Sequence, residues 1–239
     1  MLITFFSCTR AVARCFMGGL VMATVATSAI AQPTGLLYDP EPPADSAYVR
    51  VLLATDLNKV SVMVNGKVRG PALTNHQASD YMVLPAGLHQ IALVSEGKKS
   101  ATISTQLEVV RGRAMTVAFV SNQPSVAPIL FEDKTSSNKL KAMLSVYQLA
   151  VSSKTVDILT GDGATKVFAG LAYGTSGGIQ VNPISVELVA TQSGEKTPIA
   201  KTNLTMGQGT AYSVFLLPGK NGKPFASVVQ NRIERYTGK

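Results

Sequence analysis

The chain has 239 residues, with 22 lysines and arginines against 14 aspartates and glutamates, a net charge of +8 and two cysteines. Cys8 and Cys15 both lie in the first 31 residues, so the rest of the chain has no thiol for a disulfide, a nucleophile or a metal ligand. Its basic residues are scattered and not interleaved with aromatic side chains, which argues against a nucleic-acid partner.

The first 31 residues predict a secretory signal peptide. Two arginines precede an apolar stretch at residues 15–27, and Ala29-Ile30-Ala31 has the small-x-small pattern of a signal peptidase site. The apolar stretch is shorter than the ~20 residues of a membrane-spanning helix. We therefore expect cleavage before Gln32 and export from the cytoplasm; a retained anchor is the alternative. Without residues 1–31 the chain has 20 basic and 14 acidic residues, a net charge of +6.

Residues 32–46 are rich in proline and acidic side chains and predict an extended N-terminal arm. Such a segment is already stiff, so ordering it on a partner costs little conformational entropy.

Residues 47–123 predict a first domain made of short strands and turns. Val60–Val64 alternates strictly between apolar and other side chains, and Asn65-Gly66 follows at once. This combination is the strongest short-range signal for a β-hairpin. Residues 124–138, with two prolines and a Thr-Ser-Ser run, predict a connector.

Residues 139–239 repeat this plan and predict a second domain. In both halves a polar glycine turn precedes a late strand, at Arg111-Gly112-Arg113 and at Gly207-Gln208-Gly209, about 97 residues apart. Many short strands separated by Gly and Pro turns are typical of sandwiches and barrels. Because 80 to 100 residues suit one sandwich, we expect an all-β chain with two tandem β-sandwich domains.

The sequence offers few candidates for catalysis. His76 and His89 are the two histidines, and neither has a metal-ligand spacing. Residues 174–178 match G-x-S-x-G around Ser176, but a nucleophile elbow needs a helix after the serine and a histidine later in the chain. A strand is expected after Ser176 instead. We predict no catalytic residue, no metal site and no cofactor.

One stretch carries a family resemblance. Residues 35–51, G-L-L-Y-D-P-E-P-P-A-D-S-A-Y-V-R-V, resemble the start of mature AlgF-family proteins. Leu84–Gly87, Lys139–Leu144 and Ile179–Val186 resemble later segments of that family in the same order. The resemblance implies two β-sandwich domains and a periplasmic accessory role in O-acetylation of alginate or a related exopolysaccharide. The implied partners are a membrane-bound O-acyltransferase and a periplasmic SGNH-type acetyltransferase.

These observations favour a non-enzymatic periplasmic adaptor that bridges or positions acetyltransferases. The contact residues that we predict lie in the arm and the connector: Tyr38, Asp39, Pro40, Glu41, Ile129, Phe131 and Glu132. Two alternatives stay open. One is a carbohydrate-binding module for an anionic exopolysaccharide, which is also a candidate partner; the other is a serine-dependent acetyl-ester enzyme that acts through Ser176.

Overall fold

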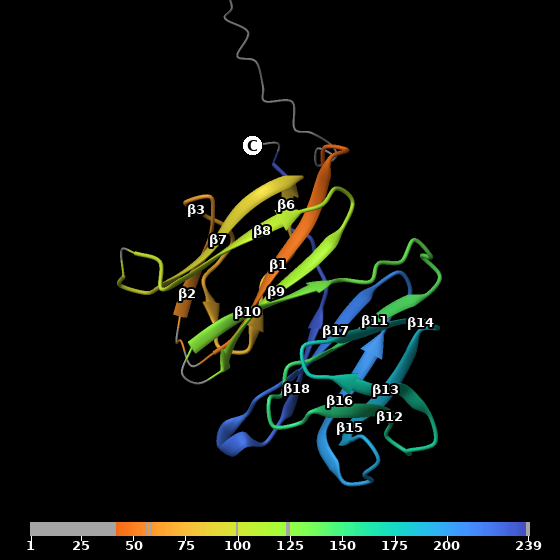
Figure 1. The fold of residues 1–239 in the computed structure, drawn as a ribbon. Coiled ribbons are helices and arrows are strands. Elements are labelled where there is room, and N and C mark those ends of the chain that lie inside the picture. The colour runs from red at the N-terminus through yellow and green to blue at the C-terminus, as the bar shows by residue number, and fades with distance from the viewer. Residues whose placement is uncertain (1–41, 56, 58, 99, 123–124, 238–239) are drawn as a thin grey trace, which may run out of the picture. The chain divides into compact units, whose positions relative to one another are not determined.

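The computed structural model describes residues 42–55, 57, 59–98, 100–122 and 125–237. In these ranges the chain is all-β, with eighteen strands and one short 3-10 helix, Lys220–Gly222 (Figure 1). None of the described residues belongs to a helix long and apolar enough to cross a membrane. The predicted signal peptide and most of the predicted arm lie outside the described residues.

Strands β1–β10 form the first sandwich from two sheets. Sheet 1 has the order β10-β9-β1-β5, with β6 also paired to β1, and sheet 2 has the order β3-β2-β7-β8, with β4 paired to β2. The strands of sheet 1 are β1 (Ser46–Ala54), β5 (Gln77–Ala78), β6 (Met82–Pro85), β9 (Ala114–Asn122) and β10 (Ser125–Glu132). Those of sheet 2 are β2 (Lys59–Val64), β3 (Lys67–Val68), β4 (Leu73–Thr74), β7 (Gly87–Ser95) and β8 (Ile103–Val109).

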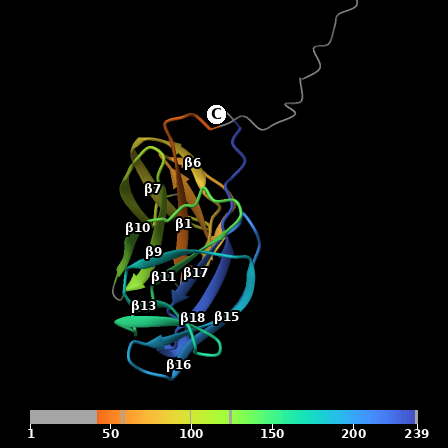
Figure 2. The same ribbon diagram turned by 90° about the vertical axis from the view of Figure 1, so that its right-hand side faces the viewer.

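Strands β11–β18 form the second sandwich (Figure 2). Sheet 3 has the order β14-β11-β17-β18, and sheet 4 has the order β13-β12-β15-β16. The strands of sheet 3 are β11 (Ala142–Gln148), β14 (Ser176–Val181), β17 (Ala211–Leu217) and β18 (Phe225–Gln230). Those of sheet 4 are β12 (Thr155–Thr160), β13 (Lys166–Ala172), β15 (Ile184–Gln192) and β16 (Pro198–Met206). The prediction of an all-β chain with two tandem sandwiches is confirmed.

The two sandwiches share the plan that the sequence predicts. In each, the first strand pairs in parallel with a late strand, β1 with β9 and β11 with β17, and the other strand pairings are antiparallel. The Asn65-Gly66 hairpin is also confirmed: both residues have positive φ, 50° and 77°, and β2 pairs with β3 on either side. Two consecutive residues with positive φ are the signature of a type I′ turn.

Three apolar clusters hold the strands together. One lies between sheets 1 and 2, a second between sheets 3 and 4, and a third joins sheet 1 to sheet 3. Along β1, Val49 and Val51 belong to the first cluster, whereas Leu52 and Ala54 belong to the third. Because β1 is buried on both faces, its sequence is a nearly continuous apolar run instead of an alternating one.

The predicted connector at residues 124–138 contains a strand. Residues 125–132 form β10 at the edge of sheet 1 and pair with β9 along their whole length. Pro128 suggested a connector, but proline is accepted in an edge strand, where one side of the backbone needs no partner. The segment that links the two sandwiches is therefore shorter and begins at Asp133.

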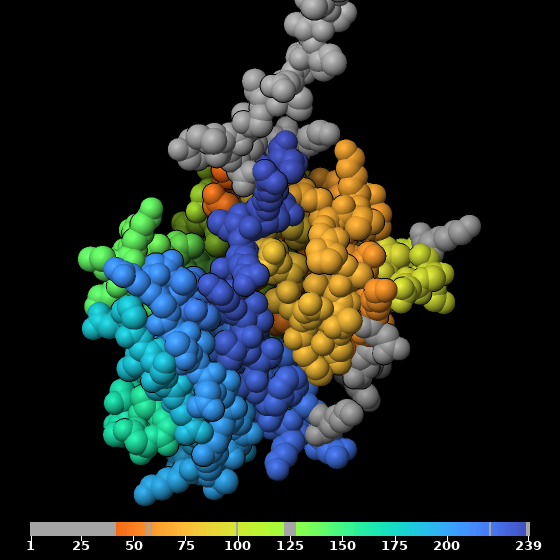
Figure 3. Space-filling view, turned by 180° about the vertical axis from the view of Figure 1, so that it is seen from behind, coloured from red at the N-terminus to blue at the C-terminus, as the bar shows by residue number. Residues whose placement is uncertain are grey.

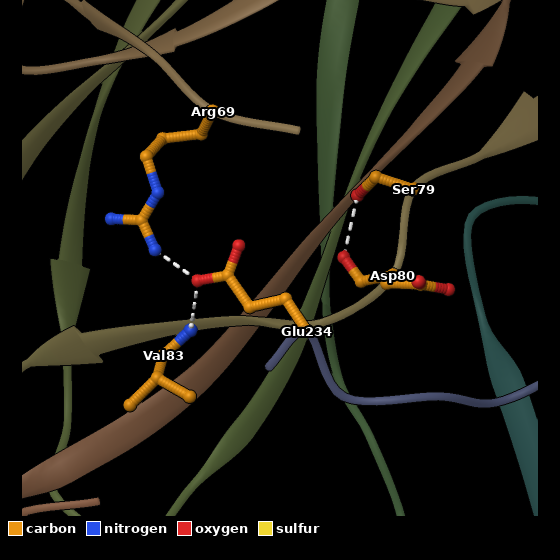
Figure 4. A network of polar contacts seen from close by, with 5 residues as sticks. All are labelled: Arg69, Ser79, Asp80, Val83 and Glu234. Atoms are coloured by element: carbon orange, nitrogen blue, oxygen red, sulfur yellow. Dashed lines mark hydrogen bonds and ion pairs between the residues drawn. The ribbon is translucent and has the colours of Figure 1, made fainter. Parts of the chain in front are cut away.

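The C-terminal segment returns from sheet 3 to the first sandwich. Figure 3 shows the dark blue end of the chain against the orange strands of the first sandwich. The Tyr81 amide donates to the Arg232 carbonyl at 2.8 Å, and the Glu234 amide donates to the Tyr81 carbonyl at 2.9 Å. The Glu234 carboxylate accepts hydrogen bonds from the Arg69 guanidinium and the Val83 amide (Figure 4). The tail thereby adds a second link between the sandwiches.

Candidate functional site

A buried arginine lies where sheet 1 meets sheet 3. Arg50 comes from β1 and is 1% exposed. Its neighbours on β1, Val49 and Val51, face the core of the first sandwich, and alternation along the strand turns Arg50 toward the second sandwich.

Four of the five N–H donors of Arg50 have partners. Nε donates to Thr116 Oγ1 at 2.8 Å, and Nη1 donates to Asn231 Oδ1 at 2.8 Å. Nη2 donates to the Tyr147 hydroxyl at 3.0 Å and to Ser213 Oγ at 2.8 Å. The partners come from β9, β11, β17 and the segment after β18, so one side chain connects both sandwiches and the tail.

Asp133 supplies the negative charge of this cluster. Its Oδ2 accepts hydrogen bonds from the Tyr81 hydroxyl at 2.7 Å and from Thr116 Oγ1 at 2.6 Å, and its Oδ1 accepts one from the Tyr147 hydroxyl at 2.7 Å. Thr116 and Tyr147 thus each contact both Arg50 and Asp133. Buried charges are tolerated when hydrogen bonds compensate for lost water, and here the two charges share a network.

The two tyrosines act as hydrogen-bond donors because they stay protonated. Burial raises the pKa of Tyr147 to about 12 and raises the pKa of Tyr81 well above its usual range. The Arg50 guanidinium also lies 4.5 Å from the centre of the Tyr81 ring, a distance suited to a cation–π contact.

A pocket of about 320 Å³ opens directly over this cluster. Tyr81, Asp133 and Asn231 belong both to the cluster and to the pocket lining. The wall includes residues 134–139, which link β10 to the second sandwich, and Arg232 and Ile233 from the tail. The pocket is therefore lined by both sandwiches and by the two segments that pass between them.

Four cations line the pocket: Lys134, Lys139, Lys141 and Arg232. Among the described residues, no ion pair joins any of the four to a carboxylate. Lys141 donates instead to the Asn182 side chain at 2.7 Å. Asp133 is the one carboxylate in the lining, and three hydroxyl donors already engage it. The pocket is suited to an anionic group attached to an apolar one, since Met143 and Ile233 also line it.

The predicted contact residues that the structure describes, Ile129, Phe131 and Glu132, do not line this pocket. Tyr38, Asp39, Pro40 and Glu41 are outside the described residues. Phe131 is 4% exposed and packs in the cluster between sheets 1 and 3. Its side chain is therefore occupied within the chain, and its contact with a partner stays a prediction.

Ile129 and Glu132, the other two predicted contact residues, differ in exposure. Ile129 is half-buried and packs against the same cluster as Phe131, whereas Glu132 is exposed and forms an ion pair with Arg113. An apolar Ile-Leu-Phe run in a supposed connector suggested a contact surface, but two of its three side chains pack against the second sandwich.

A local sequence signal exists for two of the four pocket cations and is missing for the other two. Lys139 and Lys141 stand in a K-x-K pattern beside the predicted connector, and their alternation could have placed both near one site. Lys134 and Arg232 are distant in sequence, and only the return of the C-terminal tail brings Arg232 to the pocket.

Ser176 occupies a strand and not a nucleophile elbow. It begins β14 and lies opposite Tyr147 of β11. The adjacent glycines are explained by packing, because a Cβ on Gly177 would lie 2.6 Å from the Phe168 ring and one on Gly178 would lie 2.8 Å from the Lys134 side chain.

Both histidines have contacts that involve the first sandwich. His89 bonds through Nδ1 to the Asn65 side chain and through Nε2 to the Pro85 carbonyl, each at 2.9 Å. His76 packs edge-on against Phe225. Within the described ranges, no group of three or more His, Cys, Asp or Glu side chains is arranged to hold a metal ion.

Comparison with known proteins identifies the family. Residues 19–212 match the family described as "Alginate O-acetyl transferase AlgF". The chain belongs to the AlgF family. The alginate biosynthesis protein AlgF of Pseudomonas fluorescens is 30% identical over 193 residues, which cover 81% of this chain and 82% of that protein. AlgF of Pseudomonas aeruginosa PAO1 is 27% identical over 199 residues, which cover 83% of this chain and 85% of that protein.

Among solved structures, the C-terminal domain of AlgF from P. aeruginosa aligns with 24% identity and a TM-score of 0.33. The alignment covers 39% of this chain and 100% of that domain. The AlgF resemblance that the sequence predicts is confirmed by the family match and by the AlgF relatives.

Proposed function

We propose that this AlgF-family chain is a non-enzymatic periplasmic adaptor for O-acetylation of alginate or a related exopolysaccharide. After export through its N-terminal signal, it binds a membrane-bound O-acyltransferase and a periplasmic SGNH-type acetyltransferase and positions them on the polymer. The family match and the names of its relatives support the pathway.

The observation that supports an adaptor is the preformed pocket at the junction of the sandwiches. Arg50 and Asp133 hold its floor through hydrogen bonds to both sandwiches. Its cations have no carboxylate partner among the described residues. A preorganised surface loses little conformational entropy on association, so more of the contact energy appears as affinity. Free cations on such a surface favour an acidic partner and speed encounter with it.

The direct test measures binding and chemistry in parallel. The chain beginning at Gln32 is immobilised and titrated with the purified periplasmic acetyltransferase, and the same preparation is assayed alone for hydrolysis and transfer of acetyl esters. We expect saturable binding and no turnover. Turnover by the chain alone that is lost in Ser176→Ala, with unchanged circular dichroism, would contradict the proposal.

The arm at residues 38–41 remains part of the proposal. A chain lacking residues 32–41 is expected to bind the acetyltransferase more weakly than the chain beginning at Gln32. Full affinity after this deletion would remove the arm from the contact surface.

A carbohydrate-binding module is the second candidate, and the four pocket cations favour it. Uronate carboxylates could pair with Lys134, Lys139, Lys141 and Arg232. Sugar sites also use exposed aromatic faces, but Tyr81 is 6% exposed and Tyr48 is half-buried. Titration with mannuronate oligomers at low and high salt tests this candidate, since a specific site resists salt and a purely electrostatic one does not.

A further inference from the structure

We infer that the pocket over the Arg50–Asp133 cluster binds an acidic, apolar-containing peptide segment of a partner protein. This inference rests on the proposed adaptor function and names the surface and the chemistry of the partner. Carboxylates of the segment pair with the lysines and Arg232, and an aliphatic or aromatic side chain of the segment packs on the apolar part of the lining.

The charge of the pocket lining favours an acidic ligand. The four cations come from the linking segment, the start of the second sandwich and the tail, so the fold gathers like charges that repel one another. The one carboxylate of the pocket lining, Asp133, is 8% exposed and is held by Tyr81, Thr116 and Tyr147. An incoming carboxylate would relieve this repulsion and gain charge-assisted hydrogen bonds.

The exposed apolar residues beside the cations favour a peptide over a polysaccharide. Leu140 lies between Lys139 and Lys141 and is 69% exposed, and Ile233, which lines the pocket, is 56% exposed. Met143 adds a buried apolar side chain to the lining. Exposed aliphatic side chains next to charges are typical of protein-binding surfaces, whereas a uronate chain, which is mostly hydroxyl and carboxylate groups, offers them little apolar surface.

The walls of the pocket are fixed before any ligand arrives. In the linking segment, the Asn138 amide donates to Ser136 Oγ at 3.1 Å and the Leu140 amide donates to Asn138 Oδ1 at 3.0 Å. The Gly209 amide donates to the Lys141 carbonyl at 3.1 Å. The first two bonds order the backbone of the segment and the third ties its end to the second sandwich, so this backbone needs little further ordering when a peptide binds.

Another hollow in the described part of the chain does not share this charge pattern. The hollow of about 360 Å³ between β12 and β16 combines Lys196 and Lys201 with Asp162 and Glu195, so its charges balance. The pocket at the junction has an excess of cations because its one carboxylate is already engaged.

The test uses the chain beginning at Gln32 and a fluorescent peptide of alternating glutamate and leucine, followed by fluorescence anisotropy. A peptide of equal length with lysine in place of glutamate and a mannuronate oligomer are the comparison ligands. We expect the acidic peptide to bind, the basic peptide not to bind, and the oligomer to bind more weakly than the acidic peptide. Equal binding of both peptides, or binding of the oligomer alone, would overturn the inference.

The decisive variant is Lys139→Glu combined with Lys141→Glu. It should weaken binding of the acidic peptide by about tenfold or more, because each tenfold corresponds to about 1.4 kcal/mol and two favourable ion pairs become repulsive. Lys67→Glu with Lys98→Glu is the matched control, since it makes the same change in net charge at exposed positions of the first sandwich outside the pocket lining. Equal losses in the two double variants would overturn the inference. Thermal unfolding of both variants verifies that each is folded.

Two further measurements tell failure of the pocket inference apart from failure of the adaptor function. Binding that occurs only after residues 32–41 are removed would show that the acidic arm of the chain itself fills the pocket, which would overturn the assignment to a partner. If the pocket variant keeps full affinity for the acetyltransferase, the inference fails and the adaptor function stands. If the acidic peptide binds but no acetyltransferase does, the pocket assignment stands and the adaptor function fails.

Discussion

Arg50 and Asp133 are joined through two hydroxyl groups, those of Thr116 and Tyr147, each of which accepts a hydrogen bond from the guanidinium and donates one to the carboxylate. Arg50 and Thr116 belong to the first sandwich and Tyr147 to the second, while Asp133 begins the segment between them. The link between the sandwiches therefore depends on a polar network embedded in apolar contacts.

Asp133→Asn is expected to destabilise the chain strongly. The change leaves the Arg50 charge buried without its counter-charge, and breaking a buried charged pair in this way typically costs about 3–5 kcal/mol. Urea denaturation followed by far-ultraviolet circular dichroism measures the change in the free energy of unfolding. Glu132→Gln is the control, because the neighbouring exposed ion pair with Arg113 contributes about 1 kcal/mol or less.

A double-mutant cycle tests whether the two charges act as one unit. Because they share Thr116 and Tyr147, the losses from Arg50→Ala and Asp133→Ala should not add, and the double variant should be more stable than the sum predicts by about 1–3 kcal/mol. Additivity of the two losses would show that each charge is satisfied independently of the other.

The Asp157 carboxylate should make the free energy of unfolding fall as the pH is lowered. Hydrogen bonds from Lys166, the Gly170 amide and Ser193 lower the pKa of its carboxyl from 3.8 to about 2. The group therefore stabilises the fold above its ordinary pKa, and this contribution is lost as the pH falls from about 5 to about 2. Its size is at most about 2 kcal/mol.

The Asp157 prediction is measured by comparing the free energy of unfolding of the parent and Asp157→Asn across that pH range. The difference should be largest at neutral pH and shrink toward pH 2. A difference that does not change with pH would show that the carboxylate charge is not what stabilises this site.

Gly177→Ala should destabilise the second sandwich by about 1–3 kcal/mol through overpacking. The added methyl group would lie 2.6 Å from the Phe168 ring and 3.3 Å from the Leu171 side chain, so these side chains would have to move. Gly207→Ala is the matched control, because its nearest neighbour would be at 3.7 Å, an ordinary contact. Thermal denaturation of both variants makes the comparison, and equal melting temperatures would contradict the packing explanation for this glycine.

Glu234→Ala should loosen the C-terminal tail without unfolding the sandwiches. The variant removes the acceptor of the Val83 amide and the partner of Arg69, and losing such a bond costs about 1–3 kcal/mol. Amide hydrogen exchange at Val83 should accelerate, while exchange in the strand β11 should not. Unchanged protection at Val83 would show that the tail does not shield this edge of sheet 1.

The sequence predicts the strands better than it predicts their partners. Alternation and the Asn65-Gly66 turn locate β2 and its hairpin because these signals are local. The run of apolar residues in β1 marks a strand, but it cannot tell which face meets the second sandwich. Pro128 and its neighbours suggested a connector, since the sequence does not show that β9 lies alongside to pair with them.

The candidate site depends on contacts between residues that are far apart in sequence. Arg50 and Asn231 are separated by 181 positions, and the Tyr81 amide donates a hydrogen bond to the Arg232 carbonyl in the tail. No local periodicity encodes such contacts. Arg50 lies inside the segment that resembles the AlgF family. A charged residue between two valines of an apolar strand is the signal that could have indicated a buried polar contact.

The most direct test of the adaptor account is the affinity of the chain for the periplasmic acetyltransferase, measured with the parent, the Lys139→Glu and Lys141→Glu double variant, and the Lys67→Glu and Lys98→Glu control. The account predicts saturable binding by the parent and the control and a loss of about tenfold or more in the pocket variant, since a tenfold change is about 1.4 kcal/mol. No binding by the folded parent, together with acetyl-ester turnover by the chain alone, would contradict it.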